Sequence, residues 1–130
     1  MKKVLLIEND PFIGDLLEKK LRKIGYYVFR AEDGEAGLRE IKEKNPQLIL
    51  LDMLLPRLSG LDVLKRMKEE DLFSKHPVIV ISNSGQAKEI DQVRVLGAKD
   101  WIIKTEFDPA EALEKVRQQI GQADETKIEN

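Results

Sequence analysis

The chain has 130 residues, and its 22 lysine and arginine residues against 24 aspartate and glutamate residues give a formal net charge of −2. This length fits one domain with one hydrophobic core. The near balance of charge lacks the basic excess that binding to a phosphate backbone requires, so we expect no nucleic-acid partner. The chain contains no cysteine, which excludes disulfides, thiolate metal sites and cysteine nucleophiles.

The longest apolar runs, residues 4–7 and 78–81, are far shorter than the ~18 residues of a membrane-spanning helix. Two lysines precede the first run and resemble the start of a signal peptide, but Glu8 and Asp10 interrupt the apolar stretch that follows. We therefore expect a cytoplasmic, unprocessed protein with no membrane partner.

Short apolar runs alternate along the chain with segments whose apolar residues lie three or four positions apart, which is typical of buried strands alternating with amphipathic helices. The predicted strands cover residues 4–7, 26–30, 48–51, 78–81 and 101–103. A predicted helix follows each strand, with apolar residues within 13–24, 38–41, 61–67, 90–93 and 113–120. The signals that begin or end these helices are Gly25, Pro46, Gly60 and the pair Asp108-Pro109.

Strands that are apolar throughout are typical of a parallel sheet buried on both faces. We therefore predict an α/β fold of five βα units over residues 1–120, with helices on both faces of the sheet. The polar residues 121–130 have only Ile128 to bury, and we expect them to form a frayed tail with no further domain.

Ligands of such sheets bind beyond the carboxyl ends of the strands, and the sequence places several polar residues there. They are, in chain order, Glu8, Asn9, Asp10, Asp52, Ser82 and Lys104. Carboxylates suit a hard divalent cation, Asp52 suits a nucleophile, and Ser82 and Lys104 suit the oxygens of a transferred phosphoryl group. The pattern predicts a site for a divalent cation and phosphoryl chemistry.

Three segments resemble the receiver (response-regulator) domains of two-component signalling. Residues 48–60, LILLDMLLPRLSG, are similar to the family's D-x-x-x-P-x-x-x-G signature, and the other two segments are residues 80–82, VIS, and 96–104, LGAKDWIIK. All three occur in order and at the family's spacing. The resemblance implies a stand-alone, single-domain receiver with a flavodoxin-like doubly wound fold and strand order 2-1-3-4-5.

The resemblance also implies roles for individual residues. Asp52 is the implied phospho-acceptor, Lys104 contacts the phosphoryl group, and Ser82 and Trp101 are the implied switch residues. The implied Mg²⁺ ligands are Glu8, Asn9, Asp52 and the backbone carbonyl of Leu54.

A receiver of this type takes its phosphoryl group from a histidine kinase or a phosphotransfer protein, and it is a signalling acceptor, at most self-catalysing its own phosphorylation and dephosphorylation. Because the sequence holds one predicted domain, we expect the output to pass to a protein partner. The expected surface is formed by the fourth helix, the fifth strand and the fifth helix, and the expected state is a monomer or weak dimer.

Two residues depart from the family pattern. Asn9 stands where a second acid is usual, so the site carries a charge of about −2 instead of about −3, and we predict weakened Mg²⁺ binding and slower phosphorylation. Asp10 does not replace that acid, because its position before Pro11 is typical of a helix cap. Thr105 stands where a cis proline is usual, and since a cis bond before another residue costs ~3 kcal/mol, we favour a trans bond.

Other interpretations stay open on the same residues. With Asn9 and Thr105, the chain also fits a pseudo-receiver, a phosphorylation-independent interaction module. Trp101 equally fits core packing without switching, and Ser82 also fits a loop residue that caps the next helix. His76 is interpreted as a solvated loop residue.

Overall fold

The computed structural model describes residues 2–123 and contains one parallel sheet in the order β2-β1-β3-β4-β5. The strands are β1 (Lys3–Ile7), β2 (Tyr27–Ala31), β3 (Leu48–Asp52), β4 (Val78–Ser82) and β5 (Asp100–Ile103). The helices are α1 (Pro11–Lys23), α2 (Gly34–Lys44), α3 (Gly60–Glu69), α4 (Ala87–Leu96), the short 3₁₀ helix η1 (Lys104–Glu106) and α5 (Pro109–Ile120). The predicted fold class and strand order are confirmed.

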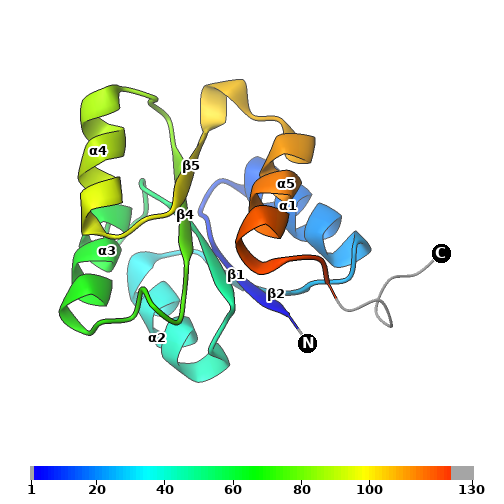
Figure 1. The fold of residues 1–130 in the computed structure, drawn as a ribbon, viewed down its shortest axis with the longest axis horizontal. Helices are drawn as coiled ribbons and strands as arrows, with labels where there is room; N and C mark the ends of the chain where they lie inside the picture. The colour runs from blue at the N-terminus through cyan, green and yellow to red at the C-terminus, as the bar shows by residue number, and fades with distance from the viewer. Residues whose placement is uncertain (1, 124–130) are drawn as a thin grey trace.

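The helices cover both faces of the sheet. Figure 1 shows α1 and α5 together on one side and α2, α3 and α4 on the other. Successive strand residues point to opposite faces, so Leu6 and Leu50 pack toward α1 and α5, whereas Leu5 and Leu51 pack toward α2, α3 and α4. Two hydrophobic cores result, and this explains why the central strands are apolar throughout.

Side-chain caps begin four of the α-helices. Asp10, Asp33, Ser59 and Asp108 accept hydrogen bonds from backbone N–H groups in the first turns of α1, α2, α3 and α5. The interpretation of Asp10 as a cap is therefore confirmed. Helix α4 follows Gln86 without a side-chain cap, and it contributes one buried residue, whereas α3 contributes four.

Gly60 lies where α3 starts, directly behind Asp52. A Cβ atom there would lie 2.6 Å from the Cα of Met53 and would collide with the carbonyl oxygen of Asp52. The Gly60 N–H also donates to the carbonyl of Met53 at 3.1 Å. The close approach of two backbone segments explains the glycine that ends the 48–60 motif.

The interpretation of His76 as solvated is wrong. Its side chain is buried, and Nδ1 lies 2.7 Å from the carbonyl oxygen of Pro46 in the connection between α2 and β3. The charged neighbours of His76 indicated a surface loop, but a residue thirty positions away provides the polar partner that allows burial.

The chain stays attached to the sheet just beyond α5. Lys2 Nζ donates to the carbonyls of Ile120 and Gln122, both at 2.6 Å, and the Tyr26 hydroxyl donates to the carbonyl of Gly121. Ala123 is buried in the core. Residues 121–123 thus differ from the expected frayed tail, whose remaining residues, 124–130, lie outside the described part of the chain.

Candidate functional site

Three charged side chains meet at the carboxyl ends of the strands. Glu8 follows β1, Asp52 ends β3 and Lys104 follows β5. Lys104 Nζ lies 3.0 Å from Asp52 Oδ2 and 3.4 Å from Glu8 Oε2, and the exposed fractions of the two carboxylates are only 2% and 0%. The parallel sheet brings these groups together because its carboxyl ends share one edge.

Burial dominates the electrostatics of this cluster. It raises the pKa of Glu8 to about 8, and the hydrogen bond with Asp52 and the charge of Asp52 act in the same direction, whereas Lys104 acts to lower it. Burial acts to lower the pKa of Lys104, but hydrogen bonding to Asp52 and the charges of both carboxylates outweigh burial and raise it. Lys104 is therefore a stable cation between two buried acids.

Both oxygens of the Asp52 carboxylate have partners. The N–H of Leu54 donates to Oδ1 at 3.0 Å, while Oδ2 faces Lys104. The N–H of Met53 donates to the carbonyl of Ile81 at 2.9 Å, which continues the β3–β4 pairing up to the loop. The carboxylate is thus held in one orientation from two sides.

The donor atoms in this cluster fit a magnesium ion. Glu8 Oε1 is buried with no hydrogen-bond partner, and an unpartnered buried oxygen is a candidate ion ligand. The oxygens of Asp52, Asn9 and the Leu54 carbonyl are of the hard type that Mg²⁺ prefers. Among residues 2–123, no group of three or more acidic, histidine or cysteine side chains forms a metal cluster, so such a site contains only two carboxylates.

Arg30 of β2 belongs to this end of the sheet, and sequence analysis missed it. Its guanidinium lies 3.0 Å from Asp15 and 3.2 Å from Glu18 on α1, and Nη2 lies 3.5 Å from the carbonyl oxygen of Glu8. A Cβ on Gly14 would collide with this guanidinium. Arg30 therefore connects β2, α1 and the segment after β1. The sequence signal that could have indicated this role is an arginine on the second predicted strand, which was expected to lie beside the first strand.

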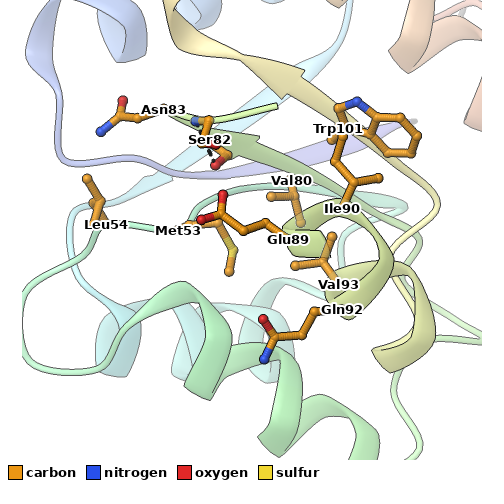
Figure 2. Close-up of a pocket in the computed structure, with 11 residues that line it drawn as sticks. Met53, Leu54, Val80, Ser82, Asn83, Glu89, Ile90, Gln92, Val93 and Trp101 are labelled. Carbon is orange, nitrogen blue, oxygen red and sulfur yellow. Dashed lines mark hydrogen bonds between the residues drawn. The ribbon is translucent and has the colours of Figure 1, made fainter. Parts of the chain in front are cut away.

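Ser82 and Trp101 line a cavity of about 280 Å³ beside the charged cluster. Ser82 Oγ accepts a hydrogen bond from the N–H of Ser84 at 3.2 Å. In Figure 2 the Trp101 ring lies to the right of the other labelled residues and points away from Ser82. The remaining lining residues are Met53, Leu54, Val80, Asn83, Ser84, Glu89, Ile90, Gln92 and Val93.

The structure thus brings Glu8, Asp52 and Lys104 into direct contact, and it places Ser82 and Trp101 at the adjoining cavity. The side chain of Asn9 is exposed next to this cluster. The peptide bond between Lys104 and Thr105 is trans, as predicted, since residues 2–123 contain no cis peptide bond. With this bond trans, the Lys104 side chain contacts Asp52.

Comparison with known proteins identifies the family. Residues 4–117 match the response regulator receiver domain. The chain belongs to this family. Response regulator receiver domains are signalling proteins, and the resemblance noted from the sequence is confirmed.

Two curated relatives are transcriptional regulators. The DNA-binding dual master transcriptional regulator RpaA of Synechocystis sp. is 34% identical over 124 residues, which cover 95% of this chain and 51% of RpaA. The alkaline phosphatase synthesis transcriptional regulatory protein PhoP of Bacillus subtilis is 34% identical over 118 residues, which cover 89% of this chain and 47% of PhoP. The chain spans about half the length of the curated relatives it matches.

Solved receiver domains share the fold. The Francisella response regulator 1452 receiver domain has a TM-score of 0.85 and 25% identity, with 92% of this chain and 96% of the other covered. The response regulator TrrA of Thermotoga maritima, solved in complex with Mg²⁺ and BeF, has a TM-score of 0.79 and 28% identity, with 92% and 100% covered.

These relatives correct the expectation about partners. We expected no nucleic-acid partner and an output through a protein partner alone, but the relatives are transcriptional regulators and one is named as DNA-binding. The net charge of a receiver domain does not report on DNA contacts that belong to the rest of a regulator. As for membranes, no helix within residues 2–123 has both the length and the apolar character needed to cross one.

Proposed function

We propose that this receiver domain accepts a phosphoryl group on Asp52 from the phosphohistidine of a histidine kinase or phosphotransfer protein. The carrying observation is the buried Asp52 carboxylate, oriented by the Leu54 N–H and paired with Lys104 at 3.0 Å. The phosphorylated state then changes a protein-interaction surface next to Ser82 and Trp101, which line the adjoining cavity. The match to the receiver family supports both parts of the proposal.

In the proposed reaction an oxygen of Asp52 attacks the phosphorus atom of the phosphohistidine. The phosphorus–nitrogen bond breaks, its electron pair returns to the imidazole, and an acyl phosphate remains on Asp52. Lys104 stabilises the anionic carboxylate before transfer and is placed to donate to a phosphoryl oxygen afterwards. The Ser82 hydroxyl, which now only accepts from the Ser84 N–H, is free to donate to a phosphoryl oxygen.

Glu8, Asn9, Asp52 and the Leu54 carbonyl are the residues that would hold Mg²⁺. When bound, Mg²⁺ neutralises charge on the transferring phosphoryl group. The unpartnered Oε1 of Glu8 supports this assignment. Asn9 removes one carboxylate, so we propose a weakened affinity.

The direct test is the intact mass of the protein after incubation with acetyl phosphate and Mg²⁺. A gain of one phosphoryl group in the wild type, absent in Asp52→Asn, is the expected result. No gain in folded wild-type protein contradicts the proposal.

A second candidate is the pseudo-receiver, a phosphorylation-independent interaction module. Site electrostatics favour it: the raised pKa of Glu8 and the neutral Asn9 both reduce the negative charge available to attract Mg²⁺. The acetyl phosphate experiment on wild type separates the two candidates, and the Asn9→Asp variant identifies the cause of a loss. If wild type gains no phosphoryl group and Asn9→Asp does, the missing carboxylate is the cause; if neither does, the loss lies elsewhere in the site.

A further inference from the structure

Trp101 is the only tryptophan of the chain, and two cations from different helices approach its ring. The guanidinium carbon of Arg94 on α4 lies 5.1 Å from the ring centroid, and Nζ of Lys115 on α5 lies 5.8 Å from it. Both distances fall within the range of about 6 Å in which a cation is attracted to an aromatic ring. We call Arg94 and Lys115 the cation pair.

Lys115 holds the backbone of Trp101 as well as its ring. Its Nζ donates to the carbonyl of Trp101 at 2.9 Å and to Oδ1 of Asp100 at 2.9 Å. The same Asp100 oxygen accepts from the N–H of Trp101 at 2.8 Å. Lys115 therefore fixes the backbone position on β5 from which the Trp101 side chain projects.

Arg94 contacts the ring and one acidic side chain of its own helix. Among residues 2–123, its charged partner is Asp91 at 3.4 Å, and both side chains are more than half exposed, so that ion pair contributes little. The attraction to the indole is therefore the contact of Arg94 that reaches another element.

A cavity next to Trp101 offers its ring a second position. The cavity of about 280 Å³ borders Trp101, and its walls beside the ring include the apolar side chains of Val80, Ile90 and Val93. Entry of the indole would bury apolar area, which is favourable. Besides the cation pair, Trp101 packs against the apolar cluster that contains Val80 and Val93, and these two residues also line the cavity.

We propose that Arg94 and Lys115 are positioning residues that hold the Trp101 ring outside this cavity and so set how often the ring enters it. The inference deepens the proposed function, on which it rests for the link between ring position and phosphorylation. Loss of one cation should raise the ratio of inward to outward rings about two- to fivefold, the factor that follows from the usual strength of such contacts.

The test uses the unphosphorylated protein, in which tryptophan fluorescence and the ¹⁹F NMR signal of incorporated 5-fluorotryptophan report on Trp101 alone. The Arg94→Met variant keeps the aliphatic stem and removes the charge. We expect a shift of emission to shorter wavelength, less quenching by acrylamide, and a two- to fivefold larger ¹⁹F population of the inward ring.

Three variants complete the experiment. Arg94→Lys restores the charge and should restore the wild-type signals, whereas Lys88→Met removes an exposed cation from the same helix and should change nothing. Lys115→Met should give a larger shift than Arg94→Met because it also releases the Trp101 carbonyl. If Lys115→Met does not fold, the exposed Arg94 series decides the question.

Unchanged spectra in Arg94→Met overturn the proposal. So does increased quenching, which would mean that Arg94 only covers the ring, and so does an equal response of Lys88→Met. Intact mass after treatment with acetyl phosphate and Mg²⁺ is recorded separately. Absence of phosphorylation overturns the proposed function and leaves the result on ring position standing, because that result is obtained without phosphate.

Discussion

The two sides of Asp52 differ in how firmly they are held. On the charged side, Lys104 is ion-paired with both Asp52 and Glu8. The backbone behind Asp52 is so close to Gly60 that a side chain there would collide with it. On the cavity side, Ser82 and Trp101 line a cavity, and α4 has no side-chain cap and one buried residue. Phosphoryl chemistry requires fixed charges, whereas a response requires an element that moves at low cost, and the structure separates the two.

The largest expected effect on the charged side is a dependence of stability on pH. Because burial raises the pKa of Glu8 from 4.5 to about 8, the folded protein binds a proton there more tightly than the unfolded chain does. This contribution to stability is fully present below pH ~4.5 and is lost as the pH rises through about 8. In EDTA, urea unfolding should give a larger unfolding free energy at about pH 5 than at about pH 8.

Glu8→Gln is the control for this pH dependence. It removes the titrating group, so the decline between about pH 5 and about pH 8 should become shallower than in wild type. Taking the difference between the two proteins cancels contributions that they share. Equal slopes would show that Glu8 does not hold its proton in the folded state.

Removal of the half-buried cation Lys104 should give the next largest effect. Lys104→Met leaves the buried carboxyl groups of Glu8 and Asp52 without their positive partner, and we expect the unfolding free energy to fall by about 3 kcal/mol. Lys99→Met, at an exposed position just before β5, should be neutral. Wild-type stability of Lys104→Met in urea would mean that the ion pairs do not hold the charged side together.

The backbone behind Asp52 can be tested with two glycines. The methyl group added in Gly60→Ala would collide with the main chain of Asp52 and Met53. We expect the unfolding free energy to fall by about 2 kcal/mol. Gly14→Ala meets only the end of the Arg30 side chain, which can move aside, and alanine favours the helix by up to about 1 kcal/mol. Thermal unfolding should therefore rank Gly14→Ala well above Gly60→Ala, and the reverse order would refute the steric argument.

The smallest effect is expected on the cavity side. Val93→Ala truncates the one buried side chain of α4, whereas Val63→Ala makes the same change in α3, which has three buried side chains. We expect about 1 kcal/mol or less of global destabilisation for Val93→Ala and more for Val63→Ala. Hydrogen exchange should accelerate across α4 alone in Val93→Ala, and faster exchange throughout the protein would contradict a weakly attached helix.

The elements and the convergence of the charged residues were predictable because their causes are local or topological. Asp10 before Pro11 indicated a cap, and Asp10 does accept hydrogen bonds from the first turn of α1. Polar residues at the ends of parallel strands had to share one edge of the sheet, and Glu8, Asp52 and Lys104 do so. The trans bond before Thr105 followed from the cost of the alternative.

Other features depend on contacts between residues far apart in the chain. The carbonyl of Pro46 turns His76 from an expected surface residue into a buried one, and Arg30 spans from β2 to α1 and the carbonyl of Glu8. No periodicity or cap signal encodes such contacts, because local patterns reflect the conformational preferences of a few neighbouring residues.

The sequence by itself determined the alternation of strands and helices, the identity of the residues at the strand ends and the membership of the receiver family. Only the tertiary structure decided that Glu8 is buried with a raised pKa, that a cavity separates Ser82 from the Trp101 ring, and that two cations face this ring. The reason is physical: backbone preferences act over a few residues, whereas burial, ion pairing and empty space arise when distant segments pack together.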